Sequence, residues 1–214
     1  QIFSMHKWLP ALLLPVMFSF CSGKQRSDEW ISLFDGKTLH GWKVGANASA
    51  FNVENGSIVV NGNVSHLYYD GKVQQHQFKD FEFKAEVMTT PGSNSGIYFH
   101  TQYQEKDWPK KGYEVQVNNS HTDWRRTGSL WAIQDVKEVY AKDNEWFALH
   151  ITVKEKHITV AINDKTVVDY TEPDNVQREE GMKDRIISSG TFALQGHDPK
   201  SKVYYRNIRV KLLP

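Results

Sequence analysis

Short runs of alternating apolar and polar residues recur along this chain and limit the folds open to it. In FEFKAEV (81–87), every second residue is apolar and the residues between them are charged. Successive side chains of a β-strand point to opposite faces, so a period of two predicts strands with one buried face. Similar runs occupy GSIVVNG (56–62), SGIYFHTQY (95–103), GYEVQVNN (112–119), GTFALQGHD (190–198) and KVYYRNIRVKLLP (202–214).

Residues 146–170 extend this pattern into three consecutive strands. Turns are expected near 154–156 and at Asn-Asp-Lys (163–165), a combination typical of tight hairpins. The best candidate for a short helix is 174–186, whose many charges fit a solvated loop equally well. No linker rich in Gly, Ser or Pro interrupts residues 30–214. We therefore predict an all-β fold, a single antiparallel two-sheet sandwich or jelly roll over 30–214.

The N-terminal segment has a different character. From Met5, a weakly basic start is followed by roughly a dozen mostly apolar residues, too few to span a bilayer as a helix. The only cysteine, Cys21, ends this run, and a polar stretch (22–29) follows. This predicts a signal peptide (1–21) ending at a lipidated Cys21, a tether (22–29), and a protein of the periplasm or outer membrane that is held to the membrane only by lipid. Phe20 stands where lipoproteins usually carry a small residue, so plain secretion and a cytosolic domain with an apolar N-terminus remain alternatives.

Charge and motifs exclude several functional classes. The chain has 26 basic and 25 acidic residues and no basic block, so a nucleic-acid partner is not expected. Neither a P-loop nor a dinucleotide-binding fingerprint is present. GSNSG (92–96) resembles a nucleophile elbow, but Asn94 replaces the serine. The nine histidines lack the close spacings of common zinc motifs.

The strand GYEVQVNN has one unusual polar face. Tyr113, Val115 and Val117 alternate with a row formed by Glu114, Gln116 and Asn118. A solvent-facing strand normally mixes Lys, Thr and Glu, whereas this row holds a carboxylate and two amides without lysine. The row fits a ligand-binding surface, and an ordinary exposed face of an antiparallel sheet is the alternative.

Further polar side chains lie on other expected strands. Tyr98 and His100 share a face of SGIYFHTQY, Gln195 and His197 lie in LQGHDP, and Arg206 lies in YYRNIRV. If these strands are neighbours, the side chains line one groove with the donors and acceptors that bind sugar hydroxyls. The alternatives are a structural role for His100 and a turn-forming role for His197.

Exposed aromatic residues add to this picture. Trp108 and Trp124 lie in polar, loop-like stretches and are candidate stacking platforms for a sugar ring, whereas Trp131 is expected in the core. HTDWRRTG (121–128) is expected to form a loop beside the Glu114 strand. His121 and Asp123 in this loop are candidate ligands for a divalent metal, the one cofactor that the sequence raises.

Seven motifs occur along the chain in this order: LFDGKTLHGWK, NSGIYFH, GYEVQVNN, TGSLW, EWFALHITV, INDKTVVDY and GTFALQGHDPKSKVYYRNIRVKLLP. Together they resemble a known family. Over residues 30–214, the chain is similar to the 3-keto-disaccharide hydrolases, a former family of unknown function that is common among exported bacterial lipoproteins. The resemblance implies a concanavalin-like jelly roll, shared in shape with lectins and glucanases. It also implies a glycoside substrate that a partner oxidoreductase has first oxidised at C3.

The implied chemistry assigns roles to the polar rows. A ketone at C3 acidifies the proton at C2, so one base, one acid and donors to the enolate suffice for elimination of the aglycone and later hydration. Glu114 is the expected base or a ligand for a polarising metal, and His197 and His100 are the candidate acid or enolate stabiliser. Asn94 shapes the turn before its strand and contacts ligand. The residues expected to position sugar hydroxyls are Gln116, Asn118, Gln195, Arg206 and Tyr98.

Two other functions remain open at the level of sequence. A surface glycan-binding module without catalysis would use the same groove and its tryptophans. A retaining glycosidase of the glucanase type needs two carboxylates about 5 Å apart. This chain has amides at 116 and 118 where such an enzyme needs its second carboxylate, which argues against that class.

Overall fold

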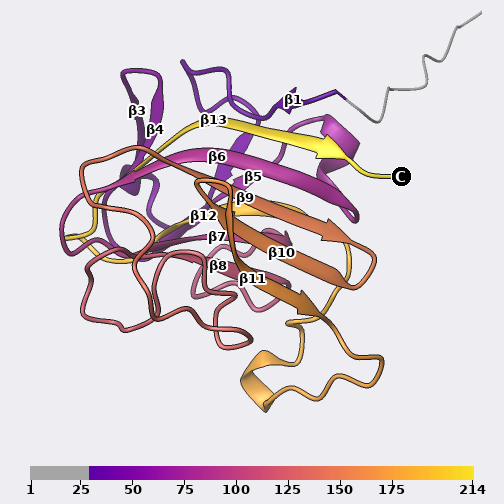
Figure 1. Cartoon of the computed structure of the whole chain (residues 1–214). Coiled ribbons are helices and arrows are strands. Elements are labelled where there is room, and N and C mark those ends of the chain that lie inside the picture. Colours follow the sequence, from indigo (N-terminus) through magenta and orange to yellow (C-terminus); the bar gives the residue numbers. More distant parts are fainter. Residues whose placement is uncertain (1–28) are drawn as a thin grey trace, which may run out of the picture.

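The computed structural model describes residues 29–214 and consists of two antiparallel sheets packed face to face (Figure 1). The eight-stranded sheet has the order β11-β10-β9-β6-β13-β4-β3, and β1 also pairs with β13. The five-stranded sheet has the order β2-β5-β12-β7-β8. The strands are β1 (Ile31–Ser32), β2 (Trp42–Val44), β3 (Phe51–Glu54), β4 (Ser57–Val60), β5 (Ser65–Tyr69), β6 (Phe81–Thr89), β7 (Ser95–Thr101), β8 (Tyr113–Val117), β9 (Phe147–Lys154), β10 (His157–Ile162), β11 (Lys165–Thr171), β12 (Thr191–Gly196) and β13 (Val203–Leu212).

This architecture confirms the predicted all-β two-sheet sandwich. The three strands expected in 146–170 are β9, β10 and β11, with turns where the sequence placed them. Within 29–214 the only helices are three 3-10 turns, η1 (Ala48–Ala50), η2 (Val73–His76) and η3 (Glu180–Met182). None of the described helices has the length and apolar character needed to cross a membrane. The predicted signal peptide, Cys21 and all but the last residue of the tether lie outside the described residues.

The core lies between the sheets and explains the alternation in the sequence. Every second residue of β6, from Phe81 to Thr89, is buried, and its apolar members join Leu149 and Ile151 of β9 in the main cluster. From the other sheet, Val115, Phe192 and their strand neighbours complete this cluster. Burying these faces supplies the main stabilisation of such a sandwich, about 25 cal/mol for each Å² of apolar surface.

The outer face of the five-stranded sheet is also largely covered. Strands β8 and β12 are buried at every position, including the polar residues that point away from the core. The loops 102–112, 118–136 and 172–190 flank these strands, and the last of them extends beyond the sheets at the foot of Figure 1. A sheet with a covered polar outer face can therefore enclose a site.

Candidate active site

A cavity of about 680 Å³ lies on the outer face of the five-stranded sheet. Side chains of β7, β8 and β12 form its floor, and residues of the loops after β8 and β11 form its walls. We call it the Glu114 cavity. It brings together most of the site residues predicted from the sequence, namely Asn94, Tyr98, Trp108, Glu114, Gln116, Gln195 and His197.

Glu114 is at the centre of the floor because of the strand register. Tyr98 of β7 lies opposite Glu114, and Gly96 lies opposite Gln116. The Glu114 side chain crosses over Gly96, where a Cβ atom would come within 2.5 Å of Oε1. The Tyr98 hydroxyl donates a hydrogen bond of 2.7 Å to Oε2, and the Gln195 amide donates one of 2.8 Å to Oε1. Glu114 is thereby held in one orientation with only 4% of its surface exposed.

Burial controls the protonation of this carboxylate. Loss of solvent raises the pKa of Glu114, and the hydrogen bond from Tyr98 and the charge of Arg185 oppose that rise only in part. Burial and the neighbouring carboxylate also raise the pKa of Tyr98 well above the ordinary tyrosine value, so Tyr98 stays a donor. A carboxylate with a raised pKa inside a cavity is suited to accept a proton from carbon.

Amide groups surround the carboxylate at fixed positions. The Gln116 amide donates 2.5 Å to Asn94 Oδ1, which ties β8 to the turn before β7. Asn94 Nδ2 lies 3.4 Å from Nδ1 of His121. The Oε1 atom of Gln195 is buried and has no hydrogen-bond partner among residues 29–214. An unpaired buried acceptor is costly, so Gln195 is the floor residue best suited to accept from a sugar hydroxyl.

His197 lies at the edge of the cavity, directly after β12. Its Nδ1 atom is 2.8 Å from Oδ2 of Asp198, which also accepts from the Ser201 hydroxyl. Burial alone would raise the pKa of Asp198, but these hydrogen bonds lower it to about 2. An ionised Asp198 favours the proton on Nδ1 of His197 and leaves Nε2 free for proton transfer.

His197 also belongs to a possible metal site. Among residues 29–214, it is part of the one cluster of His, Asp and Glu side chains that is spaced closely enough to bind a metal ion. Candidate ligand atoms of His121, His197 and Asp198 lie within 4.8 Å of one another. The predicted pair of His121 and Asp123 is therefore met only in part, because Asp123 is not in this group. Asp123 instead lines the Glu114 cavity.

Trp108, a predicted stacking platform, lines the cavity and forms an aromatic wall. It is 43% exposed, and its ring centroid lies 5.4 Å from that of His197 and 5.7 Å from that of His66. His66 is fully buried on β5, and burial lowers its pKa to about 3, so this imidazole stays neutral. An exposed indole beside buried polar groups fits the C–H face of a sugar ring.

Several cavity residues were not predicted from the sequence. Trp131, expected in the core, lines the cavity, and the guanidinium groups of Arg125 and Arg185 lie 4.9 Å and 4.7 Å from its ring centroid. Arg185 comes from 174–186, the segment interpreted as a short helix or solvated loop. These residues lie in loops, so the alternation that predicts strands could not place them at the site. Only their charge or aromatic character indicated a possible role in binding.

His100 is a correction to the predicted site. It is fully buried, and its Nε2 lies 2.8 Å from the backbone oxygen of Lys79. Its φ of +54° breaks the alternation of β7, so His100 does not share the face of Tyr98. Its ring packs edge-on against Phe81, and burial lowers its pKa to about 4. His100 is a neutral structural residue outside the Glu114 cavity.

Asn118, Arg206 and Trp124 also lie away from the cavity floor. Asn118 Nδ2 donates to the backbone oxygens of Asp123 and Arg125, so this amide holds the loop instead of a sugar. Arg206 is on β13 of the opposite sheet, where it pairs with Glu86 at 2.6 Å. Trp124 is exposed and does not line the cavity.

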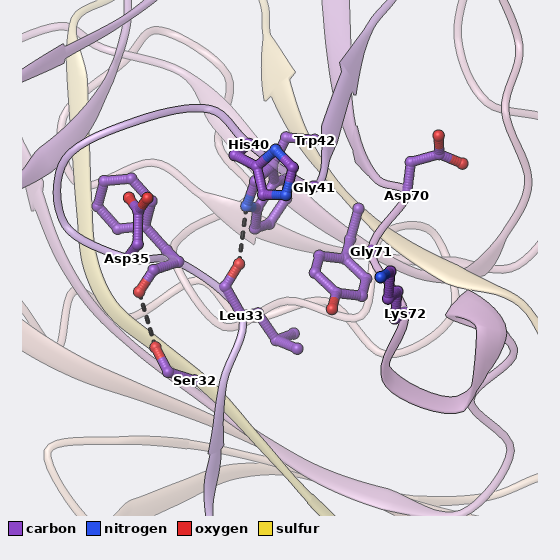
Figure 2. Close-up of a pocket in the computed structure, with 11 residues that line it drawn as sticks. Ser32, Leu33, Asp35, His40, Gly41, Trp42, Asp70, Gly71 and Lys72 are labelled. Atoms are coloured by element: carbon purple, nitrogen blue, oxygen red, sulfur yellow. Dashed lines mark hydrogen bonds between the residues drawn. The ribbon is translucent and has the colours of Figure 1, made fainter.

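A second cavity, of about 600 Å³, surrounds Trp42 and is drawn in Figure 2. The dashed lines in Figure 2 mark two hydrogen bonds: Trp42 Nε1 donates to the backbone oxygen of Leu33, and the Ser32 hydroxyl donates to the backbone oxygen of Phe34. The polar side chains of Asp35, His40 and Asp70 lie apart in this view and do not converge on one point. Asp35 accepts from the backbone of residues 37 and 38, so the motif LFDGK builds a turn. This cavity is not the candidate active site.

A covered sheet face with a buried carboxylate, fixed amides and an aromatic wall fits a carbohydrate-active class of protein. The family described as "3-keto-alpha-glucoside-1,2-lyase-like domain" matches residues 29–211, and the chain belongs to this family. The predictions of that family and of an enzyme acting on glycosides are confirmed at this level.

One curated relative and two solved structures are similar to this chain. The chain is 28% identical to a 3-keto-disaccharide hydrolase of Bacteroides thetaiotaomicron, over 87% of this chain and 79% of the relative. A proposed glycosyl hydrolase of Parabacteroides distasonis has the same fold, with a TM-score of 0.73, 22% identity, and coverage of 86% and 94% of the two chains. A carbohydrate-binding module of Bacillus subtilis shares the fold at a TM-score of 0.58 and 13% identity, covering 80% of this chain and 95% of the module.

Proposed function

We propose that this protein cleaves the glycosidic bonds of 3-keto-glycosides by elimination, followed by addition of water. The single observation that carries the proposal is the buried Glu114 carboxylate, which has a raised pKa and a fixed orientation in a polar cavity. The family and the name of the Bacteroides relative support a keto-sugar as the substrate class.

In this mechanism Glu114 removes the C2 proton of the keto-sugar. The C–H electron pair forms the C2–C3 double bond, and the carbonyl pair moves onto the C3 oxygen to give an enolate. When the enolate collapses to the ketone, a C1–C2 double bond forms and the C1–O bond breaks. The aglycone oxygen takes that electron pair and a proton from Nε2 of the imidazolium form of His197, whose orientation Asp198 fixes through Nδ1. Water then adds across the C1–C2 double bond.

The decisive experiment compares a 3-keto-glucoside with its unoxidised parent, each with and without a chelator. Cleavage of the keto compound alone is the expected result, because only a ketone acidifies the C2 proton. A loss of cleavage with chelator would assign a divalent metal to the group of His121, His197 and Asp198. Equal cleavage of both compounds would overturn the elimination mechanism.

A glycan-binding module without catalysis is the second candidate, because the exposed Trp108 beside the cavity suits sugar stacking. Binding of both glucosides without cleavage of either would establish this function. Loss of the Trp108 indole would then weaken binding more than loss of the Glu114 charge.

The pH profile gives an independent prediction for the Glu114 base. The Tyr98 hydrogen bond stabilises the ionised carboxylate and so lowers its pKa. We expect Tyr98→Phe to raise the pKa of Glu114 further, so the acidic limb of kcat/KM moves to higher pH. A pH–rate profile of both proteins checks this, and an unchanged limb would contradict Glu114 as the titrating base.

We further propose that the protein is exported and anchored by lipid at Cys21, in the periplasm or outer membrane. The apolar run before this single cysteine supports the proposal. A C3-oxidising oxidoreductase then supplies the substrate, since the elimination needs a ketone. Radiolabelled palmitate should be incorporated into the wild type and not into Cys21→Ser, and equal labelling would exclude anchoring at this residue.

A further inference from the structure

We infer that Arg185 is the cation that stabilises the developing enolate, by donating hydrogen bonds to the C3 oxygen of the substrate. This inference rests on the proposed function and adds a residue that neither the family nor the relatives assign. Arg185 lines the same cavity as Glu114, but it belongs to the loop after β11.

Arg185 is a buried cation with unused donors. The residue is only 7% exposed, and its Nη1 atom is buried without a hydrogen-bond partner among residues 29–214. The guanidinium lies over the ring of Trp131, with 4.7 Å between its Cζ and the ring centroid. A buried charge with unpaired N–H groups is costly, and a ligand oxygen would satisfy them.

The distance between Arg185 and Glu114 leaves room for a substrate oxygen. Nη2 of Arg185 lies 4.0 Å from Oε2 of Glu114, which is longer than a direct hydrogen bond. A ketone oxygen can accept from the guanidinium at about 2.8 Å but cannot hydrogen-bond to a carboxylate, so only the C2–H bond of the substrate can face Glu114. The two side chains therefore flank the C2–C3 unit of a keto-sugar, with its C3 oxygen at the cation and its C2–H bond at the base.

The chain uses several buried contacts to hold Arg185 at this position. The carboxylate of Glu172 accepts from the backbone N–H of Ile187 at 3.0 Å, and Arg178 Nε donates 2.8 Å to the backbone oxygen of Arg185. The Gly112 N–H donates 2.9 Å to the backbone oxygen of Asp184. The loop is thus fixed on both sides of Arg185, as preorganised electrostatic stabilisation requires.

Charge balance during the reaction gives Arg185 a reason to prefer the transition state. In the resting site, the only carboxylate within 4.0 Å of Arg185 among the described residues is Glu114. When Glu114 takes the C2 proton it becomes neutral, and the negative charge passes to the C3 oxygen. Arg185 then exchanges one anionic partner for another and strengthens its interaction as the enolate forms, which lowers the barrier.

Arg125 provides a matched comparison in the same cavity. Its guanidinium also lies over Trp131, at 4.9 Å, but its Nε is 3.1 Å from Oδ2 of Asp135. Arg125 therefore has its own carboxylate partner, whereas Arg185 depends on the reacting Glu114. Comparing a variant without the Arg185 guanidinium with a variant without the Arg125 guanidinium separates stabilisation of the enolate from packing on the Trp131 ring.

The test measures enolate formation without bond cleavage. 1,5-Anhydro-3-keto-glucitol has a ketone at C3 and no aglycone at C1, so enolisation appears only as exchange of the C2 proton in D₂O, followed by NMR. Arg185→Met should slow this exchange and the cleavage of a 3-keto-glucoside by the same factor, about 10²–10³-fold. Arg185→Lys should recover part of both rates. Arg125→Met should leave unchanged the ratio between the affinity for the 3-keto-glucoside and the affinity for its unoxidised parent.

Three results would overturn the inference. Slow cleavage with normal C2 exchange in Arg185→Met would place Arg185 at the leaving group. Equal weakening of the keto compound and its hydroxyl parent would make it a general binding residue. An equal loss of C2 exchange and of cleavage in Arg125→Met would show that the effect of removing Arg185 comes from packing on Trp131. Failure of the proposed function is distinguishable, because the wild type would then neither cleave nor exchange, and thermal unfolding of each variant reports whether it folds.

Discussion

Replacing Glu114 with glutamine is expected to reduce cleavage of a 3-keto-glucoside roughly 10²–10⁴-fold, the usual contribution of a general base. The substitution keeps the size of the side chain and removes its ability to accept a proton from C2. A flip of the Gln195 amide would turn its unpaired Oε1 toward the new amide, so the hydrogen bond between positions 114 and 195 is retained. The measurement is kcat with saturating substrate, together with the affinity for the unoxidised parent, which should change little.

Glu86→Gln is the matched control for this variant. Glu86 lies on the opposite sheet, where it pairs with Arg206 at 2.6 Å and makes no contact with the Glu114 cavity. We expect this control to keep full activity while it loses one half-exposed ion pair, which is typically worth less than about 1 kcal/mol. Full activity in a correctly folded Glu114→Gln protein would eliminate Glu114 as the base.

The sequence was sufficient for the fold because burial imposes a period of two on long strands. Strand β6 shows this most clearly, with Phe81, Phe83, Ala85 and Val87 in the core and each charged residue outside it. The short strands β1, β2 and β3 have two to four residues, too few for a period to be recognised. Tertiary pairing defines them, for example β1 with β13 and β3 with β4.

The candidate site was predictable where it lies on regular strands and not elsewhere. Alternation correctly placed Glu114 and Gln116 together, and pairing with β7 added Tyr98. It failed for His100, because one residue with positive φ turned the side chain out of the row. It also failed for Arg206, because a period of two identifies a polar face without indicating which sheet carries it. Arg185 reaches the cavity from a loop, whose path depends on tertiary contacts.

Gly96→Ala is expected to have the second large effect on catalysis, although it replaces no catalytic group. The new Cβ would lie 2.5 Å from Oε1 of Glu114, closer than Cβ atoms approach other atoms, and 3.0 Å from its Cγ, which is tighter than most such contacts. Because Glu114 is buried and held by Tyr98 and Gln195, it has to leave this position. A displacement of about 1 Å in a reacting group costs roughly 10²-fold in rate, and overpacking costs about 1–3 kcal/mol of stability.

A double-variant cycle separates displacement of the base from general damage. If Gly96→Ala acts through Glu114, adding it to Glu114→Gln should cause little further loss of cleavage, because the base is already absent. If it damages the cavity as a whole, the two losses should multiply, and affinity for the unoxidised parent should fall as well. Thermal unfolding of all four proteins supplies the stability comparison. Unchanged kcat in Gly96→Ala would show that the reaction does not depend on where the carboxylate rests above β7, and the base would then have to be sought elsewhere in the cavity.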